Sequence, residues 1–558
     1  MDFIRNFPFF SIMIAMFTGV ICSVLKGRAA QFLCMITSAV NTVLSLFTLI
    51  YTVSTGTSFV YWMGHFPAPF GNEIRAGSVE ALTATVFCAV IFLIILGGSK
   101  YAEEIEDSKR HYLYLLSGLL MGALLALIYT NDIFTAYVFI EINTIAACGF
   151  IMIRRTGKAV ASAIRYMVMS LLGSGLVLIG ICLLYTVTGH LLMENIHDSV
   201  VLLAHDGHYT VPLIVIIGLI TVGLAIKSGL YPFHMWIPDA YANSLPTASA
   251  MLSGLASKGY IFLLIKIYYR VIGLDSIISS DVLSIVFIFG IIAMIMGSVH
   301  ALNQGDIRRM SAYSSVSHIG YIFMCIGMGT DFGMCAALLH MYMHSMTKSW
   351  IFLSTAAIAE VSGAPVGASG KMPAGVAFDE GVTAAPVSVE QDTVREADDE
   401  IKETYVRNLS EVISYPDLHI VKPGSHSNRF DDVRGAGHRN RIAALSFMFG
   451  AFSMVGVPLF AGFASKLYIG IAAARAITKI WPVMLTLAVS TILMVGYFLR
   501  MVIQLYLPGE NGIKPVKTFR QQKRFSVAML LFALANIFVG LCSGYLIDIL
   551  EKGIQLFG

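Results

Sequence analysis

Long apolar runs are the feature that most constrains this sequence. They recur along most of the 558-residue chain, and many have about the 20 residues that a helix needs to cross the hydrocarbon core of a bilayer. Charged residues make up only 13% of the chain, about half of the fraction in a soluble domain. Because helices satisfy their backbone hydrogen bonds within lipid, we expect an all-α membrane protein.

Counting these runs predicts fourteen membrane-spanning helices. The expected ranges are 3–25, 30–52, 77–98, 112–130, 133–153, 159–186, 211–236, 247–271, 282–303, 309–328, 332–359, 441–474, 480–506 and 525–549. The first run is followed by Lys26 and Arg28 rather than by a small-residue cleavage site, so a retained helix is favoured over a signal peptide. The expected parts are helices one to three (1–110), four to eight (111–271), nine to thirteen (272–506) and helix fourteen (507–558).

The basic residues of the short loops predict the orientation. Loops after odd-numbered helices hold most of them: Lys26, Arg28, Lys100, Lys109, Arg110, Arg154, Arg155, Lys158, Arg308, Arg309, Lys514, Lys517, Arg520, Lys523 and Arg524. Loops after even-numbered helices hold only Arg75, Arg270, Arg475 and Lys479. Basic loops stay on the cytoplasmic side, so both termini of this cell-membrane protein are expected outside.

One segment, 361–440, does not fit the membrane pattern. It begins as a Gly/Ala/Pro-rich stretch and then becomes acidic. A solvated cytoplasmic loop is the favoured interpretation, and a docking element for a partner subunit is the alternative.

Lys227 marks the first expected ion site. It ends the apolar run 211–226, and Pro232 and Pro238 follow, which must break the helix because proline lacks a backbone donor. A charge within a membrane helix is costly, and transporters build ion sites at broken helices. Lys466 follows a second break in the expected helix twelve. Helices seven and twelve lie five apart and so run in opposite directions, which predicts two inverted five-helix repeats, helices four to eight and nine to thirteen.

Other charges lie deep within the expected helices. Glu141 is far from either end of its helix, and Lys258 could pair with it or pass protons to it. Arg165 is the other candidate partner of Glu141, and Lys266 is expected to snorkel to the membrane interface. A single protonated glutamate bonded to a neighbouring helix is the simpler alternative for Glu141.

Histidines form a further group of candidates. His340, His344 and Lys348 recur at i, i+4 and i+8, which places them on one helix face. Imidazole both accepts and donates protons near neutral pH, so a proton relay is favoured, with His318 and His300 as further members. Metal binding is disfavoured because no third ligand completes a zinc motif. No Cys-x-x-Cys occurs either, so iron–sulfur, nickel or flavin groups are expected only in partner subunits.

At these residues the chain resembles the antiporter-like, proton-conducting membrane subunits shared by respiratory complex I, Mrp-type sodium/proton antiporters and membrane-bound hydrogenases. The matching stretches are KSGLYPFHMWIPDAYANSLPTASAMLSGLASKGY (227–260), ALNQGDIRRMSAYSSVSHIGY (301–321), HMYMHSMTKSWIFL (340–353) and VRGAGHRNRIAALSFMFGAFSMVGVPLFAGFASK (433–466). The resemblance covers roughly residues 110–360 and 430–505. The insertion departs from the family pattern.

The resemblance implies a role for each candidate residue. Glu141 and Lys227 would form an ion pair whose making and breaking drives one half-channel, and Lys466 would end the second half-channel. Protons would pass along Lys258, His318, His340, His344 and Lys348. Arg165, His234 and His300 are the expected supporting residues.

We therefore expect a proton- or sodium-translocating subunit of a redox-driven complex of hydrogenase or complex I type, in contact with lipid and with other membrane and peripheral subunits. No catalytic chemistry is expected in this chain, and its net charge of +3 gives no reason to expect nucleic acid. A Mrp-type antiporter without a redox partner is the first alternative, and a structural membrane scaffold is the second.

Overall fold

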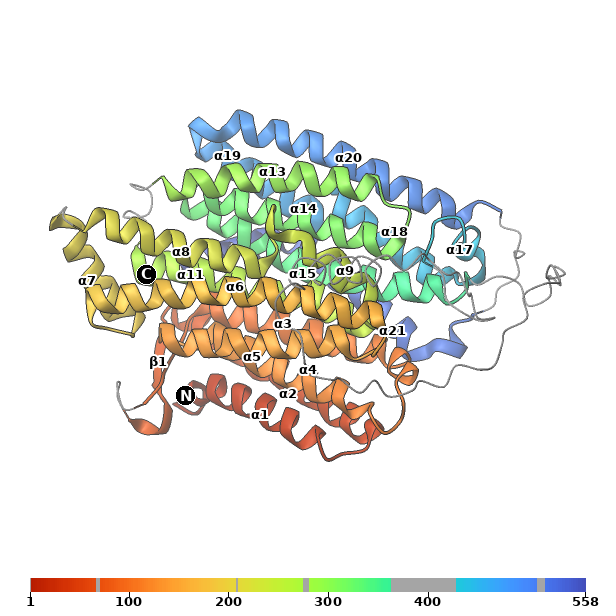
Figure 1. Ribbon diagram of the computed structural model, residues 1–558, viewed down its shortest axis with the longest axis horizontal. Helices are drawn as coiled ribbons and strands as arrows, with labels where there is room; N and C mark the ends of the chain where they lie inside the picture. The colour runs from red at the N-terminus through yellow and green to blue at the C-terminus, as the bar shows by residue number, and fades with distance from the viewer. Residues whose placement is uncertain are drawn as a thin grey trace, which may run out of the picture. The chain divides into compact units, whose positions relative to one another are not determined.

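Long helices lying side by side make up almost all of the fold (Figure 1). The computed structural model describes residues 2–66, 71–206, 209–273, 281–362, 428–508 and 517–557. Within these residues, eleven helices are long and apolar enough to cross a membrane. The chain is therefore a multi-span helical membrane protein, as the apolar runs predict.

The helices begin and end close to the expected ranges. Their bounds are α1 (Phe7–Cys22), α2 (Gly27–Thr55), α3 (Ser78–Gly98), α4 (His111–Tyr129), α5 (Ile133–Met152), α6 (Gly157–Thr188), α7 (Met193–Asp206), α8 (Thr210–Ser228), α9 (Trp236–Asn243), α10 (Pro246–Met251), α11 (Ser257–Ile267), α13 (Val282–Leu302), α14 (Ile307–Gly327), α15 (Asp331–Ala359), α17 (Ala436–Arg439), α18 (Arg441–Val455), α19 (Ala461–Arg475), α20 (Ile480–Tyr506), α21 (Lys523–Leu541) and α22 (Ser543–Gln555). The expected ranges 309–328 and 332–359 form α14 and α15, whose many polar side chains keep them out of the apolar set.

Several elements differ from the sequence-based expectation. Residues 525–549 were expected to form one helix, but the structure divides this region at Cys542 into α21 and α22. The helix α7 and an antiparallel hairpin, β1 (Phe59–Trp62) with β2 (Glu73–Ala76), were not predicted. These elements are short and lie between apolar runs, so the hydropathy pattern does not reveal them.

Glycines allow the closest helix pairs to approach. A Cβ atom added to Gly173 of α6 would lie 2.8 Å from the carbonyl oxygen of Gly223 in α8, and one on Gly223 would lie 2.6 Å from the oxygen of Gly173. In the same way, α13 and α14 meet at Gly290 and Gly320. Small residues are the usual contacts of membrane helices, because lipid provides no hydrophobic drive for helix association.

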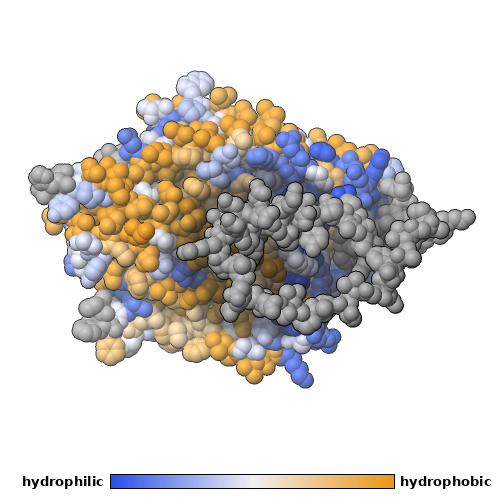
Figure 2. Space-filling view, viewed as in Figure 1, coloured by the Kyte–Doolittle hydropathy of each residue, from blue (hydrophilic) through white to orange (hydrophobic). Residues whose placement is uncertain are grey.

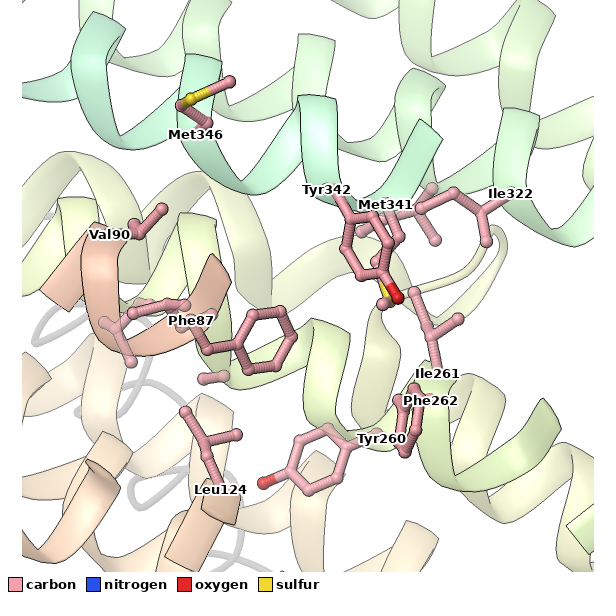
Figure 3. Packing of buried hydrophobic residues seen from close by; sticks show 14 of the residues in the cluster. Phe87, Val90, Leu124, Tyr260, Ile261, Phe262, Ile322, Met341, Tyr342 and Met346 are labelled. Atoms are coloured by element: carbon pink, nitrogen blue, oxygen red, sulfur yellow. The ribbon is translucent and has the colours of Figure 1, made fainter. Parts of the chain in front are cut away.

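The helix α15 forms the centre of the protein. Every residue from Phe332 to Ala359 is buried. Figure 3 shows Phe87 of α3 pointing into the space among Leu124 of α4, Tyr260 of α11 and Tyr342 of α15. The outer helices instead expose large apolar side chains, which cover much of the face in Figure 2. Polar groups on α15 are therefore far from lipid.

The expectation that Lys266 snorkels to an interface is wrong. Its side chain is fully buried, and its amine donates to the carbonyl oxygen of Ile128 (2.8 Å) and to that of Thr130. These are carbonyls at the end of α4 that have no partner within the helix. Arg270, which the orientation prediction assigned to a loop, is buried as well and pairs with Glu80.

Part of the predicted insertion packs on the membrane unit. Asn428 accepts a hydrogen bond from the amide of Ile307, and the imidazole of His438 lies 3.0 Å from the carbonyl oxygen of Tyr506. Residues 428–440 therefore belong with the helices. The rest of the insertion, 363–427, lies outside the described residues.

Replacing Arg270 with Met should lower the free energy of unfolding by about 3–5 kcal/mol, because Glu80 would then be left as an unpaired buried charge. The two side chains are 2% and 0% exposed. The matched control is Lys109→Met, which breaks the surface pair with Glu106 and should leave the unfolding midpoint almost unchanged. Thermal unfolding in nanodiscs measures both. Equal midpoints for the two variants would contradict this account.

Candidate functional site

Glu141 and Lys227 form an ion pair inside the helix bundle. The Lys227 amine on α8 lies 3.5 Å from Oε1 of Glu141 on α5, and the same oxygen accepts a hydrogen bond from the Ser174 hydroxyl. The amine also donates to Oγ1 of Thr144 (2.8 Å) and Oγ of Ser170 (3.0 Å). An ammonium has three donors, and three acceptors surround this one. Lys227 is fully buried, whereas Glu141 keeps 28% of its side chain exposed.

The helix break positions Lys227. The helix α8 ends at Ser228, and Gly229 takes the left-handed conformation (φ +79°). Lys227 is therefore in the last turn, where the carbonyl groups of the helix end favour a positive charge. The second break follows α18 at Gly456, which has φ +95°.

Tyr260 lies beside this pair, on the helix α11 that also carries Lys258. Its hydroxyl lies 3.3 Å from Oγ1 of Thr144, and the Lys227 amine lies 5.4 Å from the centre of its ring. Two residues earlier, the buried Lys258 amine donates to the carbonyl oxygen of Ser253 and to Oγ of Ser257 (3.1 Å). Ser253 belongs to a π-helical turn (Leu252–Ala256), an irregularity common at functional sites.

The next groups come from α14 and α15. Nδ1 of His318 lies 3.0 Å from Nε2 of His340, and the His318 ring stacks on His344 with centroids 5.2 Å apart. Lys348 donates to the carbonyl oxygen of Ser311 (2.9 Å) and to Oγ of Ser314 (2.8 Å). Lys258 is close enough to His344 and Lys348 for their charges to interact.

Lys466 lies at the far end of this series. Nδ1 of His340 is 3.2 Å from Oγ of Ser465, the residue before Lys466 on α19. The Lys466 amine donates to the carbonyl oxygen of Val455 (2.7 Å) and to Oγ1 of Thr491 (3.2 Å). Val455 ends α18, so the amine reaches back to the second helix break. It also faces the ring of Tyr321 at 5.6 Å.

We call this series the charge row. Its members are Glu141, Lys227, Lys258, His344, Lys348, His318, His340 and Lys466. Some of its nitrogens, both of His344 and Nε2 of His318, have no hydrogen-bond partner among the described residues. Buried polar groups are almost always hydrogen-bonded, and water is the partner available in a polar interior. These three nitrogens are therefore candidate positions for bound water.

The three supporting candidates lie outside the charge row. Arg165 pairs with Asp239 on α9 and is 61% exposed, so the alternative that it pairs with Glu141 is wrong. His234 and His300 stack on each other with centroids 6.0 Å apart, and no hydrogen bond between described residues connects them with the row.

Hydroxyl side chains are the functional residues that the sequence-based reasoning missed. The amines and imidazoles of the row bond to Thr144, Ser170, Ser257, Ser314, Ser465 and Thr491. The signal was available, since such residues recur one helical turn apart in apolar runs, as Ser170 and Ser174 do. In the part of the chain that the structure describes, no group of three or more His, Cys, Asp or Glu could hold a metal ion.

A multi-span helical bundle with carboxyl, amine and imidazole groups among its helices, six of them buried, belongs to the class of ion-handling membrane proteins. The amino-acid sequence shows which family of such proteins this chain belongs to. The chain belongs to the NADH:quinone oxidoreductase/Mrp antiporter transmembrane family, whose sequence model matches residues 130–364 and 417–495, more than half of the chain. The resemblance stated from the motifs is thereby confirmed.

Relatives and a solved structure agree with this assignment. The NADH-quinone oxidoreductase subunit N of Desulforudis audaxviator is 26% identical over 512 residues, 89% of this chain and 87% of the relative. A Na(+)/H(+) antiporter subunit of Alkalihalophilus pseudofirmus is 25% identical over 305 residues, 54% of this chain and 59% of the relative. A chain in the archaeal membrane-bound sulfane sulfur reductase, a respiratory membrane complex, shares the fold with a TM-score of 0.79 at 23% identity, over 100% of this chain and 98% of that one.

Replacing Gly229 with Ala should destabilise the protein by about 1–3 kcal/mol, because the added Cβ meets a positive φ. It would also lie 2.2 Å from Cδ1 of Ile237. Gly218→Ala in the same helix is the control. Its Cβ meets nothing within 4 Å, so the change should be neutral or stabilising by about 0.5–1 kcal/mol. Unfolding midpoints in nanodiscs check both, and a harmless Gly229→Ala would refute the importance of this break.

Proposed function

We propose that the chain translocates protons as an antiporter-like subunit of a redox-driven, multisubunit membrane complex. One observation carries the proposal: the charge row places eight ionisable side chains, from Glu141 on α5 to Lys466 on α19, among membrane helices, and six of them are buried. Intramembrane ionisable groups are costly, and membrane proteins keep them for function.

The Glu141–Lys227 pair acts as the switch. While the amine stays near Glu141, each charge stabilises the other by a few kcal/mol, the order expected for unit charges about 4 Å apart in a partly screened site. Thr144 offers the amine a second position toward Tyr260 at little cost, because it already accepts a hydrogen bond from Lys227. Movement in that direction brings a positive charge nearer to Lys258 and favours release of its proton.

The histidines pass the proton onward. One nitrogen of the His318–His340 contact donates and the other accepts, and exchange of these roles moves a proton from α14 to α15. Like charges on Lys258, His344 and Lys348 repel, so a proton arriving at one position drives the next one forward. Lys466 then receives or supplies the proton at the second break.

The finer architecture follows from the same elements. We propose fourteen spans and two inverted repeats, because an amine lies at the break between α8 and α9 and another reaches the break between α18 and α19. A cytoplasmic location for the basic loops is supported by Arg28, Lys100 and Arg524, which line one cavity and so share one face. On this orientation, both termini lie outside and the insertion is cytoplasmic.

A redox-driven complex is favoured over a free-standing antiporter. The NADH-quinone oxidoreductase relative matches 89% of the chain, whereas the Na(+)/H(+) antiporter relative matches 54%. Imidazoles carry protons and are poor ligands for Na⁺, which prefers oxygen ligands, so H⁺ is the favoured ion. Iron–sulfur, nickel or flavin groups that supply the electrons are proposed to lie in partner subunits.

Replacing Lys227 with Ala and Glu141 with Gln together should lower proton flux by at least about a hundredfold, the usual loss when a proton-transfer group is removed. Flux is measured with a pH-sensitive dye in liposomes that hold the native complex. Arg165→Ala is the control, since this exposed residue pairs with Asp239 outside the charge row. Normal flux through the double variant would leave the structural scaffold as the surviving alternative.

Purification of the native complex should recover redox subunits together with this chain. Iron, nickel and flavin are then measured in the purified material by metal analysis and fluorescence. A Mrp-type antiporter would instead copurify without these groups and would show Na⁺-dependent proton flux with no electron donor.

A further inference from the structure

A basic cavity and an apolar groove lie along one seam of the membrane unit. The cavity, of about 740 Å³, is lined by residues at the start of α2, the end of α3 and the start of α21. The groove, of about 660 Å³, is lined by later residues of α2 and α21, earlier residues of α3, and parts of α15 and α22. Since α3 packs against both α2 and α21, it forms the floor of the seam.

The two spaces share one face of α2 and of α3. One face of α2 carries the cavity residues Arg28, Phe32 and Met35 and the groove residues Leu46 and Leu49, because they follow the three- and four-residue spacing of a helix. The small residues Ala39 and Thr42 continue this stripe between them. On α3, the stripe from Val86 through Leu93 reaches Lys100 past Gly97, where Ala528 of α21 packs on it.

Unpaired positive charge gathers at the cavity. Six cations line it, against the single carboxylate of Glu103: Arg28, Lys100, Arg110, Arg520, Lys523 and Arg524. Lys100 and Arg110 have their own partners, Glu360 and Asp107. The other four form no ion pair with the residues that the structure describes.

The groove is apolar and lies at the depth of acyl chains. Val90 and Leu93 come ten and seven residues before Lys100, which places them about 10–15 Å away along α3. Half of the hydrocarbon core of a bilayer is about 15 Å thick. Figure 3 shows Val90 and Met346, which contribute to the groove from α3 and α15.

We propose that this seam binds an anionic phospholipid, with the headgroup in the basic cavity and the acyl chains along α2 toward the groove. Basic pockets between membrane helices attract anionic headgroups, and an anionic phospholipid matches both the charge of one end and the apolar lining of the other. An apolar helix of a neighbouring subunit would offer no acceptor to the four cations that have no ion pair among the described residues.

The test measures lipid retention by the full chain in nanodiscs. Arg28→Gln/Arg524→Gln should weaken the preference for phosphatidylglycerol over phosphatidylcholine with the same chains about 25-fold, from about fivefold for each cation. Native mass spectrometry counts the retained lipids. Lys26→Gln/Arg441→Gln is the matched control, since both cations line neither space. Equal retention by the two double variants would overturn the proposal.

A second variant separates lipid from other occupants. Ala89→Trp fills the groove and should weaken phosphatidylglycerol while leaving soluble glycerol phosphate unaffected. Equal binding of glycerol phosphate and phosphatidylglycerol by the wild type would mean a headgroup site alone and would overturn the proposal. If a variant lost a copurified subunit while its lipid retention stayed unchanged, this result would also overturn the proposal.

Photoactivatable phosphatidylglycerol tests the wild type directly, should a variant fail to fold. Labelling should fall on peptides from α2, α3 and α21. Labelling spread evenly over the lipid-facing helices would contradict a specific site.

Discussion

The rest of the structure depends on the hydrogen bonds that satisfy the buried Lys227 ammonium. Inside a bilayer, an unsatisfied charge costs several kcal/mol, so the fold has to supply an acceptor for each donor. Three helices do so: α8 brings the lysine, α5 brings Glu141 and Thr144, and α6 brings Ser170. The close approach of α6 and α8 at Gly173 and Gly223 makes this geometry possible.

The same solution recurs across the protein. Each amine of the charge row bonds to a backbone carbonyl or a hydroxyl group. Two of the carbonyls lie where a helix ends or turns irregular, whereas Lys348 uses the carbonyl of Ser311 within α14. Lys258 uses the π-helical turn before α11, and Lys466 uses the end of α18. Among the residues that the structure describes, Lys227 alone of these four lysines has a carboxylate partner, and the other three amines donate to carbonyl and hydroxyl oxygens. In the proposed function, such an arrangement would transmit charge movement over distance, since one charge is felt by the next.

Sequence reasoning predicted the elements that depend on long patterns. Apolar runs, prolines and glycines were enough for the main helices and for both breaks. The same reasoning failed for Lys266 and Arg165, because partners distant in the sequence decide those positions. Lys266 is buried only because the end of α4 presents free carbonyls to it. Arg165 meets Asp239 only because α9 turns back over α6 after the break. Neither contact leaves a trace in local periodicity.

The central claim is that protons pass through the charge row rather than around it. Proton flux of the reconstituted complex with His340 replaced by Leu tests this most directly, with His234→Leu as the matched change of a buried histidine outside the row. We expect His340→Leu to abolish flux while the complex still assembles, and His234→Leu to leave flux near the wild-type rate. Undiminished flux in His340→Leu would contradict the account.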